Sequence, residues 1–314
     1  MYYLGIDLGG SNIAAGVVDE TYRLLSNVSI PTRIPCTPQE LCDRLAQAAN
    51  AAIQLAGVES VAYAGIGCPG SVNQATGMVN LAPNLFLRNY PLGEEMANRL
   101  GVPVFLDNDA NAAAWGECKA GALKGSQNAI AVTLGTGIGT GILLNGSIYT
   151  GKNGAAGELG HMVIERGGRA CNCGRAGCWE RYASATGLIT TTKELLAADT
   201  AHSSVIWDMI NGDMAQVSGK TAFDAMRAGD VLGQNIVDTF VADLSCGIIN
   251  LINGFQPDII CIGGGISREK ETLLAPLRKI VEQEQFETGS EEKTVLVPAQ
   301  LGNDAGIIGA ALLG

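Results

Sequence analysis

The chain starts each of its two halves with the same short pattern: an apolar run, a glycine turn and a second apolar run. The turn is Gly9-Gly10-Ser11 in the first half and Gly135-Thr136-Gly137 in the second half. Each pattern predicts two antiparallel strands joined by a tight turn. The repetition therefore predicts a duplicated core with a cleft between the two halves.

A helix signal follows the first strands. Thr37 and Glu40 form a capping box around Pro38, and an apolar stripe then extends to Leu55 and stops at Gly57. Apolar runs and helical periodicities predict the other elements. Strands are expected at 2–8, 13–18, 24–30, 61–66, 102–106, 130–134, 141–144, 258–262 and 294–297, and helices at 92–100, 236–252, 269–284 and after the capping pair Asn303 and Asp304.

Strands that alternate with helices predict an α/β fold with two lobes, each built on a mixed β-sheet flanked by helices. The chain of 314 residues is long enough for two such lobes. We expect a small lobe over 1–120 and a large lobe over 121–302. The last helix, within 303–314, is expected to pack back on the small lobe.

The composition excludes several classes of protein. A net charge of −11 opposes binding to nucleic acid or to an anionic membrane, because both require a cationic surface. The first residues lack the cationic start and apolar core of a secretory signal, and no stretch is expected to span a bilayer. We therefore expect a cytoplasmic protein without a membrane or nucleic-acid partner.

Three cysteines lie close together at Cys171, Cys173 and Cys178, shortly after His161, one of only two histidines. Thiolate sulfur and imidazole nitrogen are the ligands of a tetrahedral zinc site, and the glycines between the cysteines allow a tight loop around an ion. The pattern predicts a structural Zn²⁺ site with these four ligands. The alternative is a loop of reduced cysteines, with the histidine elsewhere.

The two glycine turns are also candidate phosphate sites, because backbone N–H groups can converge on phosphate oxygens where no side chain intervenes. Asp7 precedes the first turn, and Thr136 provides a hydroxyl in the second. Either turn alone could be an ordinary hairpin. Two in equivalent places favour a polyphosphate held between them.

Other nucleotide motifs do not fit. The chain has no GxxxxGK[ST] sequence, which excludes a P-loop. The segment 65–70 matches GxGxxG but leads into turn residues instead of a helix, which opposes a dinucleotide site.

A polar cluster, Asp107-Asn108-Asp109-Ala110-Asn111, stands where the expected strand 102–106 ends and a helix begins. Ligands bind at the carboxyl ends of strands in open α/β sheets. A simple helix cap explains one of the two aspartates, but not the whole cluster.

These motifs together resemble the ROK family of repressors, open reading frames and sugar kinases, within the actin-like ATPase (ribonuclease H-like) superfamily of folds. The string CxCGxxGCxE over 171–180 is nearly specific for that family. The resemblance extends over almost the whole chain. Its other segments are 7–11, 68–72, 82–85, 108–111, 135–141 and 157–161.

The resemblance implies a role for each matching residue. Asp109 is implied as the general base that takes the proton of a sugar's 6-hydroxyl as it attacks the γ-phosphorus of ATP. His161 is implied to bind zinc through one ring nitrogen and to face the sugar with the other. The implied sugar contacts are Gly70, Asn84, Asn108, Asp109, Glu158, His161 and Glu180. The implied surroundings of the phosphates and Mg²⁺ are Asp7, Gly9, Gly10, Ser11, Asn12, Gly135, Thr136 and Gly137, and the implied adenosine turn is Gly264 with Gly265.

The sequence departs from the family pattern at a few positions. Ser11 replaces a more usual threonine but keeps the hydroxyl. Asn12 and Asn73 stand where many glucokinases of the family carry a basic residue and an aspartate. The change at Asn73 leaves details near the sugar open.

The function that the resemblance implies is an ATP-dependent hexose kinase of the glucokinase branch, and we expect sugar binding to close the two lobes and exclude water. An N-acetylhexosamine kinase is the alternative substrate class. A sugar-responsive repressor is opposed by the acidic charge and by an expected strand that begins at Tyr2. A catalytically silent sugar sensor is opposed by Asp109. Family resemblance also favours a homodimer.

Overall fold

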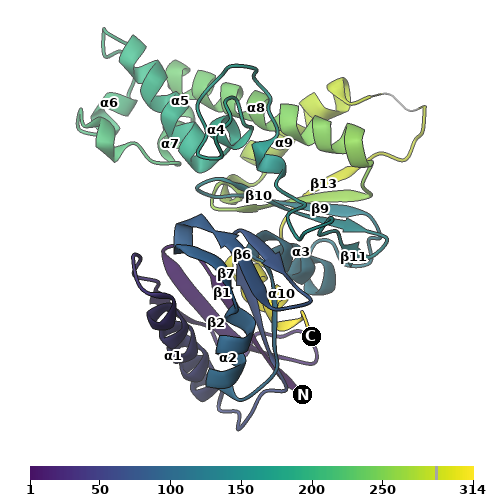
Figure 1. Cartoon of the computed structure of the whole chain (residues 1–314). Helices are drawn as coiled ribbons and strands as arrows, with labels where there is room; N and C mark the ends of the chain where they lie inside the picture. Colours follow the sequence, from purple (N-terminus) through teal and green to yellow (C-terminus); the bar gives the residue numbers. More distant parts are fainter. Residues whose placement is uncertain (287–288) are drawn as a thin grey trace. The chain divides into compact units, whose positions relative to one another are not determined.

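The computed structural model describes residues 1–286 and 289–314 and divides the chain into two compact units (Figure 1). Unit 1 comprises Met1–Ala131, Thr140–Gly157 and Ala299–Gly314. Unit 2 comprises Val132–Gly139 and Glu158–Pro298.

The first five-stranded sheet has the order β3-β2-β1-β4-β8. Its strands are β1 (Tyr2–Leu8), β2 (Asn12–Asp19), β3 (Val28–Pro31), β4 (Ala64–Cys68) and β8 (Val104–Asn108). The antiparallel meander β1-β2-β3 confirms the prediction for the first thirty residues. In contrast, β1, β4 and β8 are parallel, so their carboxyl ends lie at one edge of the sheet, with Asp7, Gly67 and Asp107 in register.

Two helices cover one face of this sheet. Successive side chains of a strand point to opposite faces, so Leu4, Ile6 and Leu8 of β1 share one face, where they join the buried core. Helices α1 (Pro38–Ala56) and α2 (Leu92–Leu100) contribute to the same core. Helix α1 begins with the predicted capping box. Leu55, the last residue of the predicted apolar stripe, is 62% exposed, so the buried part of the stripe ends before it.

The opposite face of the sheet is covered by α10 (Ala305–Ala311), which also packs on α3 (Asp109–Ala120). Gly5 and Gly65 of the sheet lie so close to this helix that a Cβ on them would meet the backbone carbonyl oxygens of Ile307 and Ala310. The missing side chains therefore let the helix backbone reach the sheet. The last helix does pack back on the first sheet.

The end of the chain differs from the prediction in its cap. The short 3₁₀ helix η5 (Gly302–Asp304) precedes α10, and Asp304 occupies the N-cap position without a side-chain cap hydrogen bond. Its carboxylate instead accepts a hydrogen bond of 2.7 Å from the Asn27 side chain. The partner lies far away in the sequence, which explains why a local cap rule gave the wrong interaction.

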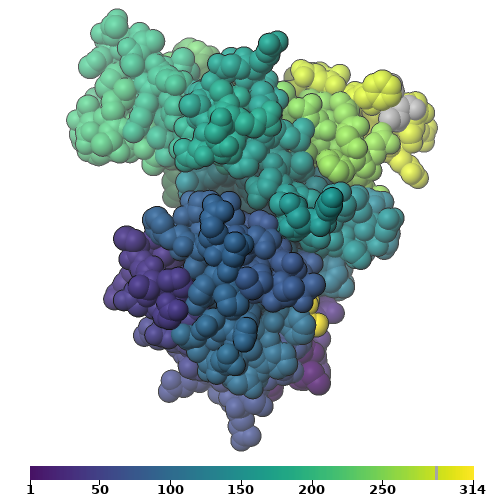
Figure 2. All heavy atoms as spheres, in the orientation of Figure 1, coloured from purple at the N-terminus to yellow at the C-terminus, as the bar shows by residue number. Residues whose placement is uncertain are grey.

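A small antiparallel sheet of three strands lies in unit 1 and was missed in the sequence. Its strands are β5 (Ser71–Asn73), β6 (Met78–Ala82) and β7 (Leu87–Tyr90), with the 3₁₀ helix η1 (Pro83–Leu85) between β6 and β7. The three strands are short and separated by turn residues, so they give almost no periodic signal. Atoms of this part of the chain (blue) cover much of the face of unit 1 that Figure 2 shows.

The second five-stranded sheet has the order β11-β10-β9-β12-β13. Its strands are β9 (Ala129–Leu134), β10 (Ile138–Leu144), β11 (Ser147–Ile148), β12 (Ile259–Gly264) and β13 (Val295–Pro298). The strand pair β9 and β10 confirms the hairpin predicted around Gly135. All five strands lie within 121–302, and those of the first sheet within 1–120, although the compact units have other bounds. The expected lobe boundaries stay a prediction.

Most helices of the chain's second part surround the long helix α8 (Val231–Phe255). The α-helices are α4 (Glu180–Ala183), α5 (Ala185–Ala198), α6 (Ile206–Met209), α7 (Thr221–Arg227) and α9 (Glu271–Glu284), and the 3₁₀ helices are η2 (Leu159–His161), η3 (Met214–Gln216) and η4 (Ile266–Glu269).

Helix α8 corrects the expectation that no stretch could cross a bilayer. By length and composition alone, it is long and apolar enough to do so. However, 61% of its most apolar window is buried inside the protein. Its buried side chains, such as Ile236, Phe240 and Leu244, place it in a protein core, which explains its apolar composition.

One buried carboxylate joins two distant segments of unit 1. Glu117 of α3 is 2% exposed and accepts hydrogen bonds from the backbone N–H groups of Ala122 at 2.7 Å, Gln300 at 3.1 Å and Leu301 at 2.8 Å. These segments follow α3 and precede α10. The carboxylate therefore fixes the ends of both helices to each other.

We predict that Glu117→Ala lowers the free energy of unfolding by about 3–5 kcal/mol, because three backbone N–H groups lose their buried acceptor. Urea denaturation measures this change. Glu59→Ala, at an exposed position, is the control and should change the free energy by less than about 0.5 kcal/mol. A loss below about 1 kcal/mol for Glu117→Ala would contradict the assignment.

Candidate functional site

Polar side chains gather at the carboxyl edge of the first sheet. Asp7 is the last but one residue of β1, and Asp107 lies two strands away in the same register row, with Gly67 between them. Asn108 ends β8 and Asp109 begins α3. The predicted polar cluster therefore stands where parallel strands end, as expected for a ligand site in an α/β sheet.

Asn108 caps helix α3, instead of either aspartate considered for that role. Its side-chain oxygen accepts hydrogen bonds from the N–H groups of Ala110 at 2.8 Å and Asn111 at 3.2 Å. Its amide nitrogen donates to the carbonyl oxygen of Gly70 at 3.1 Å. One N–H of the amide remains for another acceptor, because an Asn side chain carries two donors.

Gly70 joins this cluster through a backbone shape that favours glycine. Its φ is +88°, and a Cβ would lie against the carbonyl oxygen of Leu81. Its own carbonyl is the acceptor for Asn108. A side chain at position 70 would therefore disturb the strand β6 beside the cluster.

The first glycine turn joins β1 and β2. Gly9 donates its N–H to the carbonyl oxygen of Asn12 at 2.9 Å. The buried residue Thr32, which follows β3, donates its hydroxyl to the carbonyl of Gly9 at 2.7 Å and its backbone N–H to the carbonyl of Ser11 at 2.8 Å, so the end of β3 holds the turn. Ser11 and Asn12 are exposed. The exposed residue Asn84 is near, since its Cβ lies 4.0 Å from the place a Cβ would take on Gly10.

Asp7 is electrostatically unusual. Burial, followed by the negative charge of Asp109, raises the pKa of the Asp7 carboxyl from 3.8 to about 6. A cation beside the two carboxylates would favour their ionised forms. This environment fits a divalent metal ion.

The predicted zinc ligands come together in unit 2. The ligand atoms of His161, Cys171, Cys173 and Cys178 all lie within 4.8 Å of one another. The sulfurs of Cys173 and Cys178 are 3.6 Å apart. Ligands in a tetrahedral site with zinc–sulfur bonds of about 2.3 Å stand roughly 3.8 Å apart. The structure therefore agrees with a Zn²⁺ site and opposes the alternative with a remote histidine.

The two ring nitrogens of His161 face different groups. Nδ1 lies 3.6 Å from the sulfur of Cys171 and 3.6 Å from a carboxylate oxygen of Glu180. Nε2 lies 3.9 Å from a carboxylate oxygen of Glu158. Nδ1 is therefore the nitrogen on the side of the cysteines, and Nε2 is on the side of the Glu158 carboxylate.

Glu180 also contacts the second glycine turn. A Cβ on Gly137 would meet its carboxylate oxygen, so the glycine leaves room for the Glu180 side chain in this position. The turn itself closes with a hydrogen bond of 3.0 Å from the Gly135 N–H to the Gly137 carbonyl. Ala185, at the start of α5, donates to the Gly135 carbonyl at 2.9 Å. Thr136 is exposed in this turn.

The expected adenosine turn lies directly beside the second hairpin. Gly264 has a φ of +85°, and a Cβ on it would lie 2.5 Å from the carbonyl oxygen of Leu134. Gly265 is exposed next to it. Only a glycine lets β12 and β9 approach each other in this way.

The predicted site residues thus form two groups, one in each unit. Unit 1 holds Asp7, Gly9, Gly10, Ser11, Asn12, Gly70, Asn84, Asn108 and Asp109. Unit 2 holds Gly135, Thr136, Gly137, Glu158, His161, Cys171, Cys173, Cys178, Glu180, Gly264 and Gly265.

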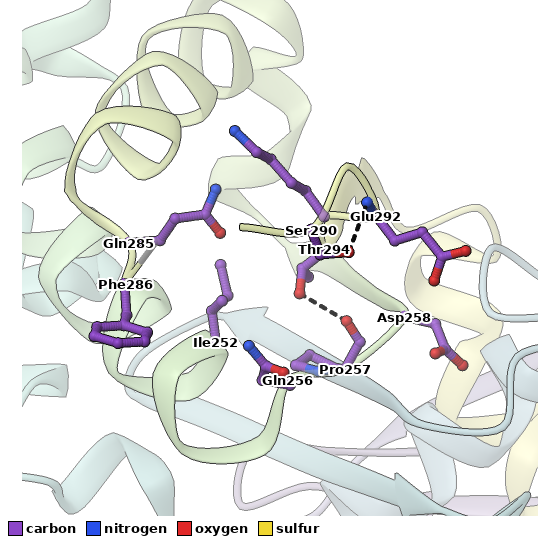
Figure 3. A pocket seen from close by; sticks show the side chains of 10 residues that line it. Ile252, Gln256, Pro257, Asp258, Gln285, Phe286, Ser290, Glu292 and Thr294 are labelled. Carbon is purple, nitrogen blue, oxygen red and sulfur yellow. Dashed lines mark hydrogen bonds between the residues drawn. The ribbon is translucent and has the colours of Figure 1, made fainter. Parts of the chain in front are cut away.

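A separate hollow of about 410 Å³ lies in unit 2, between the end of α8 and the segment before β13 (Figure 3). Its walls form hydrogen bonds among themselves, such as the 2.7 Å bond from the Thr294 hydroxyl to the Pro257 carbonyl. Among the described residues that line it, none is a predicted site residue. Its lining is Ile252, Gln256, Pro257, Asp258, Gln285, Phe286, Ser290, Glu292, Lys293 and Thr294.

The sequence did not reveal the residues that support the site through hydrogen bonds to its members. Thr32 fixes the first glycine turn, and Gln74 donates to the Asp107 carboxylate at 2.5 Å. Neither belongs to a motif, and both act over distances in sequence that no local pattern reveals. Asp107 belongs to the polar cluster identified in the sequence, but the sequence analysis assigned it no catalytic or binding role.

The chain is similar to known proteins over almost its whole length. A sequence model of the ROK family matches residues 3–314. Glucokinase from Streptomyces coelicolor is 39% identical, with 98% of this chain and 96% of the relative covered. Glucokinase from Thermotoga maritima is also 39% identical, with coverages of 98% and 95%.

A solved structure is similar as well. It is the crystal structure of a ROK family glucokinase from Streptomyces griseus in complex with glucose and AMPPNP, with 36% identity, a TM-score of 0.86 and coverage of 99% of this chain and 98% of that one. The predicted fold class, two mixed sheets with flanking helices in an actin-like ATPase fold, is confirmed.

We predict one zinc ion per chain in the purified protein, and its loss in Cys173→Ser, because serine is a poor zinc ligand. Elemental analysis measures the metal. Cys246→Ser, at an exposed cysteine outside the cluster, is the control and should keep the zinc. An unaltered protein without zinc would contradict the assignment.

We predict that Asp7→Asn raises the free energy of unfolding at pH 7 by about 1–3 kcal/mol, because an ionised Asp7 is costly to bury. The folded-state pKa of about 6 lies above the unfolded value of 3.8, so this cost is absent below the unfolded value, grows as the pH rises between the two values and is fully present above the folded one. The gap between the two proteins should therefore vanish near pH 4 in urea denaturation. A gap of constant size would contradict the prediction.

Proposed function

We propose that this chain, which belongs to the ROK family, is an ATP-dependent sugar kinase that converts glucose to glucose 6-phosphate. The observation that carries this proposal is the 39% identity to glucokinases over 98% of the chain. The carboxylates and amides at the edge of the first sheet supply the chemistry that the reaction requires.

Asp109 is the proposed general base. It is the first residue of α3, and its carboxylate accepts a hydrogen bond of 3.0 Å from the Ala110 N–H. This bond fixes one side of the carboxylate. The proton of the attacking 6-hydroxyl passes to Asp109 as the oxygen bonds to the γ-phosphorus and ADP leaves.

The proposed sugar contacts combine amides, carboxylates and one imidazole. The remaining N–H of Asn108 and the exposed side chain of Asn84 can bind hydroxyls, as can the Gly70 backbone. Glu158 and Glu180 accept hydrogen bonds from other hydroxyls. With Nδ1 of His161 on the cysteine side, Nε2 is the nitrogen proposed to face the sugar. Zinc, when bound, would fix the orientation of that ring.

The two glycine turns are the proposed phosphate sites, since both present backbone N–H groups without large side chains. Mg²⁺, when bound, would neutralise charge on the phosphates, and Asp7 is the residue proposed to hold it. Asp7 is half-buried near Asp109, so a cation there relieves repulsion between two carboxylates. Gly264 and Gly265 are proposed to lie beside the adenosine. The homodimer and the cytoplasmic location stay predictions.

We predict that the purified protein with Mg-ATP releases ADP with glucose at least about tenfold faster than with N-acetylglucosamine or N-acetylmannosamine, at equal concentrations.

Asp109→Ala should lower kcat by about 10²- to 10⁴-fold, with glucose binding largely retained, because only the proton acceptor is removed. A coupled ADP assay and calorimetry measure the two effects.

The control for this variant is Asp43→Ala, which removes a carboxylate that is 71% exposed on α1 and should keep kcat. Near-normal turnover of Asp109→Ala would show that Asp109 is not the general base. Faster turnover of an N-acetyl sugar would instead favour an N-acetylhexosamine kinase.

A further inference from the structure

Asp107 is a buried carboxylate for which the proposed reaction has no direct use. Its side chain is 3% exposed. It accepts hydrogen bonds from the Gln74 amide at 2.5 Å, from the Asn111 amide at 3.0 Å and from the Asn108 backbone N–H at 2.7 Å. All three donors are neutral, and no lysine or arginine of the described chain forms an ion pair with it.

Such a group is expensive to bury. Loss of hydration raises the pKa of the Asp107 carboxyl, whereas its three hydrogen bonds act in the opposite direction. An apolar residue would fill the same space without this cost. The role of the carboxylate is therefore to hold its three hydrogen-bond donors in place, in addition to filling space in the core.

The three donors belong to different parts of the candidate site. Gln74 lies in the turn between β5 and β6, close to Gly70 in the sequence, and Asn111 lies in the first turn of α3. Asn108 is the residue that leaves β8 and caps that helix. One carboxylate thus joins the hairpin, the strand end and the helix start.

Asp109 stands in the middle of this arrangement. Before it, Asn108 is bonded to Asp107, and after it, Asn111 is bonded to Asp107 and to Asn108. On the sheet side, a Cβ on Gly67 would lie 3.4 Å from the Cα of Asp109, so the backbone of β4 passes close to that of Asp109. The backbone of Asp109 is therefore confined from several sides.

We propose that Asp107 is a positioning residue, whose carboxylate fixes the strand-to-helix turn and thereby aims Asp109 at the sugar hydroxyl. This inference rests on the proposed function of Asp109. Asp107 itself does not touch the substrate. Its effect is on the geometry of proton transfer.

The first test compares two alanine variants in the ADP assay. Asp107→Ala should lower kcat by about 10- to 100-fold, because a displacement of about 1 Å at a reacting group can cost that much, while the KM for ATP changes less than about threefold. Glu117→Ala is the matched control, since Glu117 is 2% exposed, lies in α3, the helix that Asp109 begins, and also accepts three N–H donors. At a temperature where denaturation shows both variants folded, Glu117→Ala should keep kcat within about threefold.

The second test reverses the polarity of one hydrogen bond. Gln74→Glu places a carboxylate against the Asp107 carboxylate and should lower kcat, because the donor becomes a second acceptor. Adding Asp107→Asn places an amide opposite the new carboxylate, and kcat of the double variant should be at least about tenfold higher than that of Gln74→Glu alone. If Asp107 only stabilised the fold, kcat measured where all variants are fully folded would not recover in the double variant.

The outcomes separate the two levels of the proposal. An unaltered protein without sugar-dependent ADP release overturns the proposed function, and this inference with it. An active protein in which Asp107→Ala keeps its kcat overturns the inference alone. Equal losses of kcat in Asp107→Ala and Glu117→Ala, or no recovery in the double variant, also overturn it.

Discussion

The close approach of α10 to the first sheet is the constraint on which unit 1 depends. Gly5 and Gly65 carry no side chains, so the helix backbone reaches the strands directly. The same helix meets α3 where Gly309 stands against the backbone of Ala112. Because α3 begins with Asp109, this packing sets how the helix start meets the carboxyl edge of the sheet. Residues at the very end of the chain thus support the part of the candidate site that lies in unit 1.

Elements with strong local signals could be predicted from the sequence. The capping box of α1 and the apolar runs of β1 and β2 gave both the type and the approximate bounds of these elements. The strands β5, β6 and β7 could not be predicted, because each has only three to five residues and lies among turns. The pairing of Asp304 with Asn27 depends on tertiary contact and leaves no local pattern.

The candidate site shows the same division. Metal ligands need a few residue types at close spacing, so Cys171, Cys173 and Cys178 were recognisable, and the structure brings His161 to them. Supporting residues such as Thr32 have no such signature, because their role depends on a hydrogen bond to a segment that is distant in the sequence. Acidic groups at the sheet edge follow from parallel strands ending together, but the links among them are visible only in three dimensions.

The account depends on Asp109 facing the hydroxyl that reacts. The most direct measurement is a crystal structure of the protein with glucose and a non-hydrolysable ATP analogue. We predict a carboxylate oxygen of Asp109 within about 3.2 Å of the sugar's O6. A carboxylate turned away from O6, with another acidic side chain in its place, would contradict the account.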